Sequence, residues 1–94
     1  MKVVWLEDAV YDLRELRHYI AKDNAIAANH VAKKILEAIE LLSAQPEMGR
    51  AGRVPHTREL IIADIPYIIP YRVKNNFIEI LRVYHSAMEW PEEF

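Results

Sequence analysis

Positively charged side chains concentrate in one segment of the sequence, between Gly49 and Arg58. This segment contains Arg50, Arg53, His56 and Arg58 and has no acidic residue. The whole chain carries a net charge of −2 with an isoelectric point near 6.1, so the cluster stands out against a slightly acidic background. Guanidinium groups bind carboxylates and phosphates through paired hydrogen bonds. We therefore expect this cluster to contact an acidic partner or a target, with a solvated loop surface as the alternative.

The C-terminal end of the chain carries the opposite charge. It contains Glu89, Glu92 and Glu93 and no basic residue. Trp90 lies among these acids, and small domains depend on large aromatic side chains for burial. We therefore expect Trp90 to hold the acidic tail against the rest of the protein, and the same argument makes Trp5 a packing residue.

Composition argues against several other kinds of chemistry. The 94 residues contain no cysteine, so no disulfide can form, and four scattered histidines lack the spacing of a zinc site. We expect neither a metal nor a cofactor. No stretch approaches the roughly 20 apolar residues that a membrane helix needs, and the N-terminal apolar run is too short for a signal peptide. A cytoplasmic protein without membrane contact is therefore expected.

Hydrophobic periodicity predicts one α+β domain that spans residues 1–94. Runs of β-branched and aromatic residues predict strands, and apolar residues spaced three or four apart predict helices. The expected order is a strand at 2–6, helices at 8–22 and 25–44, a loop at 46–57, and strands at 58–63, 67–73 and 77–84. A very short connection joins the helices, so they form an antiparallel hairpin. This hairpin is expected to cover one face of a small, mostly antiparallel sheet.

Particular residues mark the ends and turns of these elements. Asp8 can cap the first helix, and Asp23-Asn24 ends that helix and can cap the second, because these side chains can accept from backbone amides of the first turn. Asn75 and Asn76 tolerate the left-handed conformation that a tight hairpin turn requires. Pro70 has no amide hydrogen, so we expect it to face away from a partner strand or to lie beside a bulge.

Each predicted helix has one apolar face that should form the core. In the first helix the face consists of Val10, Leu13, Leu16 and Ile20, and in the second of Ala28, Val31, Ala32, Ile35, Ala38, Ile39 and Leu42. Ile26 and Leu36 lie opposite the second stripe and could form a surface for a partner. A chain this short buries a limited core, so a bound partner protein is expected to add to its stability.

Three segments of the sequence resemble the RelE/ParE family of small bacterial toxins. The segments are Asp12-Leu13 with Tyr19-Ile20-Ala21, Asn24 and Ala27-Ala28; Pro46–Pro55 with Thr57–Leu60; and Tyr67–Val73 with Ile80–His85 and Trp90-Pro91. They follow the family's order and cover nearly the whole chain. The resemblance implies two helices on a small twisted sheet, and a toxin of a type II toxin–antitoxin system that a cognate antitoxin neutralises by wrapping over its surface.

The family contains two branches that act on different targets. ParE-like members poison DNA gyrase, whereas RelE-like members cut messenger RNA on the ribosome, and a shared fold does not separate the two. Where the RelE branch carries an arginine that contacts phosphate, this chain has Ile68, and its net charge of −2 does not favour a phosphate-dense target. The resemblance therefore favours a ParE-like inhibitor that binds DNA gyrase and has no catalytic residue of its own.

Two alternative functions stay open. The first is a ribosome-dependent mRNA endonuclease, in which His85 would act as general acid or base while Arg58 and Arg82 bind the phosphate. In that case the ribosome and mRNA would be partners. For His85, the simpler hypothesis is a strand-end histidine bonded to a neighbour. The second alternative function is an interaction module that has lost toxicity.

Overall fold

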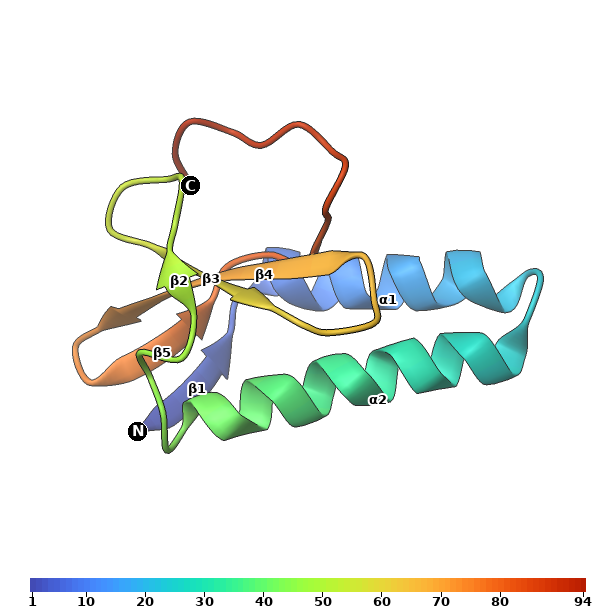
Figure 1. The fold of residues 1–94 in the computed structure, drawn as a ribbon, viewed down its shortest axis with the longest axis horizontal. Coiled ribbons are helices and arrows are strands. Elements are labelled where there is room, and N and C mark those ends of the chain that lie inside the picture. The colour runs from blue at the N-terminus through green and yellow to red at the C-terminus, as the bar shows by residue number, and fades with distance from the viewer.

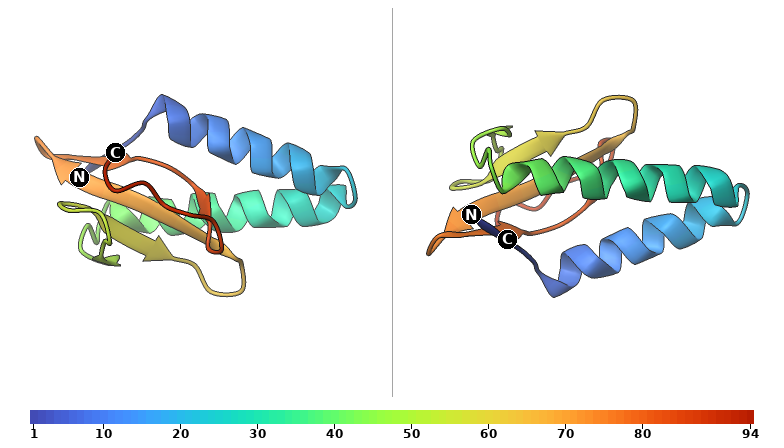
Figure 2. Two further views of the ribbon diagram at one scale, coloured as in Figure 1. Left: turned by 90° about the horizontal axis from the view of Figure 1, so that it is seen from above. Right: turned by 90° about the horizontal axis from the view of Figure 1, so that it is seen from below.

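Two helices pack against a six-stranded sheet in the computed structural model, which describes residues 1–94 (Figure 1). The helices are α1 (Glu7–Ala21) and α2 (Ala25–Leu42). The strands are β1 (Lys2–Trp5), β2 (Arg50–Ala51), β3 (Arg58–Ile61), β4 (Tyr67–Lys74), β5 (Phe77–Ile80) and β6 (Tyr84–His85). The C-terminal tail lies on the face of the sheet that is turned away from α2 (Figure 2). Both helices are too short or too polar to span a bilayer.

The strand order across the sheet is β1-β5-β4-β3-β2, and β6 also pairs with β4. All these pairs are antiparallel except β1 and β5, which run parallel with Lys2 opposite Phe77. The central strand β4 is the longest and is buried from Ile68 to Tyr71. The predicted α+β fold with a mostly antiparallel sheet is confirmed.

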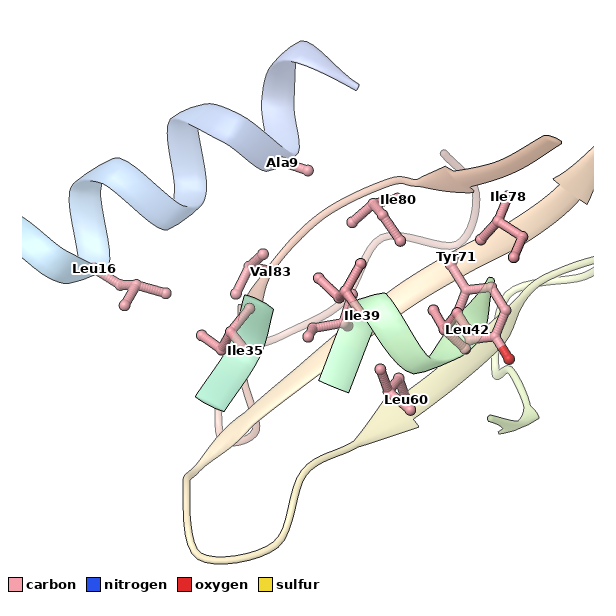
Figure 3. Packing of buried hydrophobic residues seen from close by; sticks show 11 residues of the cluster. Ala9, Leu16, Ile35, Ile39, Leu42, Leu60, Tyr71, Ile78, Ile80 and Val83 are labelled. Atoms are coloured by element: carbon pink, nitrogen blue, oxygen red, sulfur yellow. The ribbon is translucent and has the colours of Figure 1, made fainter. Parts of the chain in front are cut away.

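The hydrophobic core lies between α2 and the sheet (Figure 3). Ile35, Ile39 and Leu42 of α2 belong to one buried cluster with Tyr71 of β4 and Ile80 of β5. Fully burying an aliphatic side chain of this size contributes about 1.5–3 kcal/mol. The predicted apolar face of the second helix is thus confirmed, since all of its members are buried or partly buried.

Two predictions about the first helix are wrong. The sequence places Val10 in the core, but this side chain is 39% exposed, whereas Ala9 is fully buried. The sequence also predicts Asp8 as the cap, but α1 begins at Glu7 and has no side-chain cap. The carbonyl of Leu6 accepts hydrogen bonds from the amides of Ala9 and Val10. Because β1 passes directly into α1 at Leu6, this passage sets the orientation of the helix and brings Ala9 to the core.

Other local predictions are confirmed. The Oδ1 atom of Asn24 accepts a hydrogen bond of 3.0 Å from the amide of Ala27 and so caps α2. Asn75 and Asn76 have φ angles of 52° and 64°, which is the left-handed conformation expected of the β4–β5 turn. Ile26 and Leu36 are exposed, as expected for residues opposite the core stripe.

The last predicted strand is interrupted between β5 and β6, opposite Pro70. The carbonyl of Pro70 accepts a hydrogen bond from the Leu81 amide at 3.0 Å, but its nitrogen has no hydrogen to return. The Val83 amide instead donates to the Oδ2 atom of Asp12 in α1. The strand predicted at 77–84 is therefore corrected to two short strands, because Pro70 cannot continue the ladder. In addition, the loop predicted at 46–57 contains the short strand β2.

Candidate functional site

The predicted basic cluster is built around a buried carboxylate. Glu59 of β3 is 1% exposed and accepts five hydrogen bonds from two arginines. Arg50 donates from Nε at 3.2 Å and Nη2 at 2.9 Å to Oε1. Arg53 donates from its backbone amide at 2.7 Å and from Nε at 3.0 Å to Oε2, and from Nη2 at 3.3 Å to Oε1.

These contacts determine the charge state of Glu59. Burial alone would raise the pKa of its carboxyl group, but the hydrogen bonds from Arg53 and Arg50 act in the opposite direction and outweigh burial. The pKa therefore lies below its ordinary value of 4.5, and the group is ionised at neutral pH. One negative charge thus lies between two positive charges.

Local backbone geometry brings the two arginines together. Arg50 lies directly opposite Glu59 in the β2–β3 pair, and neighbours across a strand pair share one face of the sheet. The chain then turns back through Gly52, whose amide donates to the carbonyl of Thr57 at 2.8 Å. A Cβ atom on Gly52 would lie 2.2 Å from the Oγ1 of Thr57, so only glycine fits this close approach. The turn returns the Arg53 amide and side chain to Glu59.

Arg53 also connects this cluster to the C-terminal tail. Its guanidinium carbon lies 3.9 Å from the ring centroid of Trp90, an arrangement in which cation and ring attract each other. The Trp90 ring makes an edge-on contact with Tyr84 at 5.1 Å, and Phe94 stacks on Tyr84 at 6.2 Å. The prediction that Trp90 holds the acidic tail against the protein is therefore confirmed.

The other two members of the predicted cluster lie apart from Glu59. Arg58 faces the helices and donates from Nη1 to the carbonyl of Gly49 at 2.7 Å and, more weakly, to that of Glu47 at 3.4 Å. His56 lies exposed in the turn between β2 and β3 with a φ angle of 64°, which is uncommon for a residue with a side chain. The four residues therefore do not form one cluster. Arg50 and Arg53 bind Glu59, Arg58 binds the backbone carbonyls of Gly49 and Glu47, and His56 is exposed at the tip of the loop.

The segment Gly49–Arg58 contains no acid, but in the fold its arginines are not an isolated basic cluster. Glu59 follows Arg58 directly and neutralises much of the local charge. The sequence contains a usable signal, because Glu59 alternates with the core residue Leu60 along a strand and must face the other side of the sheet. A buried acid on that face needs cationic partners, and because the adjacent Arg58 faces the other side of the sheet, Arg53 and Arg50 are the next arginines in sequence.

The three residues of the nuclease hypothesis are not gathered into one site. Arg82 donates to Asp12 from Nε at 2.8 Å and from Nη2 at 2.9 Å, and this pairing raises its pKa above the ordinary value. His85 pairs with Tyr67 near the start of β4, whereas Arg58 pairs with Tyr71 on the other side of the same strand. The Nδ1 atom of His85 accepts from the amide two residues further on, as the simpler hypothesis expects.

A groove runs along the outer side of the helical hairpin. Its volume is about 600 Å³, and its floor is largely apolar, including Leu13, Ala28 and Ala32. Arg14 and Arg17 line the same groove, and Arg17 donates to the Oδ1 atom of Asn29 at 2.8 Å across the two helices. The groove offers an apolar surface with basic residues along it.

Comparison with known proteins identifies the family. Residues 3–90 match the family model described as ParE toxin of type II toxin-antitoxin system, parDE. The chain belongs to the ParE toxin family. It is therefore a toxin of a type II toxin–antitoxin system, and the predicted resemblance is confirmed.

Relatives and a solved structure agree with this assignment. The chain is 44% identical to a protein of Sinorhizobium fredii named as a candidate toxin, Y4kP, over 97% of this chain and 94% of that protein. It is 35% identical to toxin RelE2 of Caulobacter vibrioides, over 92% and 96% of the two chains. A chain from a structure of the chromosomal ParDE TA system from P. aeruginosa is 30% identical, with a TM-score of 0.82 over 93% of this chain and 97% of that one. Membership of this family implies a cognate antitoxin.

Proposed function

We propose that this ParE-family toxin stops bacterial growth by binding DNA gyrase in the cytoplasm, without catalysis of its own. The main support for the proposal is that the two arginine side chains a nuclease would need are already bound to other groups of the protein. Arg82 is bound to Asp12 through two hydrogen bonds, and Arg58 holds the carbonyl of Gly49. Each guanidinium is thus held by a contact within the protein, and the two do not converge with His85 on one site where a reacting phosphate could be stabilised. The net charge of −2 supports the same proposal.

The proposal assigns the contact with gyrase or antitoxin to the segment that carries Arg50, Arg53, His56 and Arg58. The side chains of Arg50 and Arg53 are 54% and 43% exposed. In both, Nε and Nη2 bind Glu59, so Nη1 is left to donate to a partner. An acidic group on the partner would meet cations whose geometry is already fixed by the buried carboxylate.

A direct assay tests the proposed target. Purified toxin added to purified gyrase and relaxed plasmid should inhibit supercoiling, and induction in a bacterial host should arrest growth while bulk messenger RNA stays intact. His85→Ala should retain both effects, because no proton transfer depends on this residue. Cleavage of ribosome-bound message at fixed codon positions, if it disappears in His85→Ala, would instead establish the nuclease alternative, for which loss of an acid or base costs about 10²–10⁴-fold in rate.

The contact surface is tested at the loop tip. His56→Glu places a negative charge beside the arginines, and we expect it to weaken binding of gyrase or antitoxin. His56→Asn is the conformational control, because asparagine adopts the left-handed backbone more readily than most residues. His30→Glu makes the same chemical change at an exposed position of α2 and should have no effect. Equal binding by all three variants and the wild type would contradict this assignment of the surface.

A further inference from the structure

The C-terminal tail, residues 86–94, is attached to the rest of the protein by few contacts. The Ser86 amide donates to the carbonyl of Pro66 at 2.9 Å, and the Met88 amide donates to the carbonyl of His85 at 3.2 Å. Residues 89–94 form no backbone–backbone hydrogen bond, and none of their glutamates forms an ion pair. In Figure 1 this segment, drawn in red, arches from the end of β6 toward the loop that follows β2. Most of the tail is therefore held by side chains alone.

Two aromatic side chains supply these contacts. Trp90 lies against the guanidinium of Arg53 and the ring of Tyr84, and Phe94 stacks on the same Tyr84 ring. Phe94 remains 41% exposed, so the partly buried Trp90 is the main anchor. Ordering residues 89–94 costs conformational entropy, which opposes this small number of contacts. The attachment of the tail thus depends mainly on one side chain.

The Trp90 anchor is incompletely satisfied. Its Nε1 atom is buried without a hydrogen-bond partner, and a buried donor that has lost water without gaining an acceptor destabilises the closed tail. A hollow of about 640 Å³ lies between the tail and the body of the protein, and its walls include Trp90, Phe94, Leu6 and Leu81. Both features favour release, because release returns Nε1 to water and sacrifices little packing. The closed and open states of the tail are therefore close in free energy.

The surface beneath the tail combines an aromatic ring with positive charge. Arg50 and Arg53 share the single carboxylate of Glu59, which leaves one positive charge in excess. Tyr84 is 4% exposed while the tail covers it, and it would lose the cover of two rings on release. Asp8 is the one acid outside the tail that lines the hollow. Negative groups of a ligand are therefore favoured at the Arg53 end of this surface.

The tail itself indicates which ligand this surface accepts. Its three glutamates surround Trp90, and Glu92 and Glu93 line a second hollow of about 250 Å³ together with His56. An acidic segment with an aromatic residue from another protein could make the same contacts. The tail of a second copy is at a disadvantage, because the tethered tail of the same chain is present at an effective concentration of about millimolar.

We propose that the C-terminal tail is autoinhibitory and that, when closed, it occupies the surface at Arg53 and Tyr84 to which an acidic segment of a partner protein binds. The partner inserts an aromatic ring in place of Trp90, and its carboxylates meet the excess positive charge. The tail must open before the partner binds, so the fraction of open chain sets the apparent affinity. This inference goes beyond the proposed function, because it concerns the chain alone and does not require gyrase as the target.

Displacement of the tail can be followed at Trp90. In a Trp5→Phe chain Trp90 is the only tryptophan, since the sequence contains two. The probe is a synthetic peptide with the sequence of residues 86–94 in which phenylalanine replaces the tryptophan, so the peptide adds no tryptophan fluorescence. Addition of this peptide should increase the quenching of Trp90 by acrylamide, because the displaced indole is exposed to solvent.

Binding in trans measures the competition. The same peptide with its tryptophan retained is titrated by NMR against the wild type and against Trp90→Ala, whose own tail has lost its anchor. A tail that is closed about nine-tenths of the time weakens the apparent affinity about tenfold. We therefore expect Trp90→Ala to bind the peptide about tenfold more tightly than the wild type does, with the signals of Arg53 and Tyr84 shifting on binding.

Controls separate the anchor from the rest of the tail. Met88→Ala changes an exposed residue that makes none of the ring contacts, and it should bind the peptide as the wild type does. A peptide with alanine in place of the tryptophan should not bind, and added salt should weaken binding of the intact peptide. Circular dichroism checks that each variant is folded. If Trp90→Ala is not, the quenching measured in the Trp5→Phe chain decides.

The outcomes are distinct. Tighter binding by Trp90→Ala, together with displacement of Trp90 by the phenylalanine peptide, supports the proposal. Equal affinity of both chains, or quenching that the peptide does not change, overturns the autoinhibition. No binding to folded Trp90→Ala overturns the surface. A dimer that forms as the wild-type concentration rises, with Trp90 still shielded, assigns the surface to the tail of a second copy and overturns the partner. None of these measurements uses gyrase, so a failure here is distinct from a failure of the proposed target.

Discussion

Replacing Glu59 by glutamine removes the charge of the buried carboxylate without changing its volume. Five N–H groups converge on the two carboxylate oxygens, and in glutamine one of these oxygens becomes an NH₂ group that can only donate. Three of the donors bind Oε1 and two bind Oε2, so in either orientation of the glutamine amide at least two donors face its NH₂ group and lose their acceptor. One buried donor without a partner costs about 1–3 kcal/mol, and the loss of charge adds to this. We expect Glu59→Gln to destabilise the chain by about 2–3 kcal/mol.

Thermal and urea denaturation at pH 7 measure this loss. In a domain of this size each kcal/mol lowers the melting temperature by about 4–8 °C, so the variant should melt about 10–20 °C below the wild type. Trp90 fluorescence should change as well, because Arg53 stacks on that ring. Glu37→Gln is the matched control, since its partner lies 3.8 Å away and both side chains are exposed, and it should change stability by less than about 0.5 kcal/mol.

The pH dependence gives a second, independent test. Since the pKa of Glu59 is lowered in the folded chain, the ionised group stabilises the fold above its ordinary pKa of 4.5. This contribution is lost as the pH falls below 4.5 and through the lowered pKa, where protonated Glu59 no longer attracts the arginines. The difference between wild type and Glu59→Gln should therefore shrink in acid. A variant as stable as the wild type at pH 7, or a difference that does not change with pH, would refute the account of this cluster.

Three further substitutions test other contacts by urea denaturation. Gly49→Ala should cost about 1–3 kcal/mol, because its Cβ would lie 2.6 Å from a ring carbon of the buried Tyr71; a loss below about 0.5 kcal/mol would mean that the ring moves aside. Asp12→Ala should cost about 2–3 kcal/mol, since it leaves Arg82 and a backbone amide unpaired in a partly buried site; an unchanged midpoint would contradict this pairing. Asn24→Ala should cost about 1 kcal/mol through loss of the α2 cap, and no change would mean that water replaces the cap.

Features that depend on neighbours in sequence were predictable. The apolar face of α2, the Asn24 cap and the Asn75-Asn76 turn follow from periodicity, capping chemistry and backbone preference, and each is confirmed. Their causes act within a few residues. The order of helices and strands follows from the same kind of signal, so the fold class could be inferred before the strands were paired.

Features that depend on pairing across the sheet were not predictable. The break between β5 and β6 arises because Leu81 lies beside Pro70, which cannot return a hydrogen bond. The residues around Leu81 do not predict this contact. The sequence alone leaves Arg82 as a candidate for the nuclease site, because its partner Asp12 lies far away in sequence and their contact is visible only in the fold. The role of Glu59 lies between these cases, because its alternation along β3 is a local signal whereas its contacts depend on the loop closed at Gly52.

The parallel pairing of β1 with β5 also constrains when the chain can fold. β1 is made before the other strands of this sheet, but its neighbour in the sheet, Phe77–Ile80, is made only after both helices and β2 to β4. Until then Lys2–Trp5 has no strand to join, and the apolar face of α2 has no complete sheet to cover. Contacts between distant segments form late because the intervening chain must first be closed into a loop. A toxin with this pairing therefore acquires its complete sheet only after Phe77–Ile80 has been made, however early β1 was available.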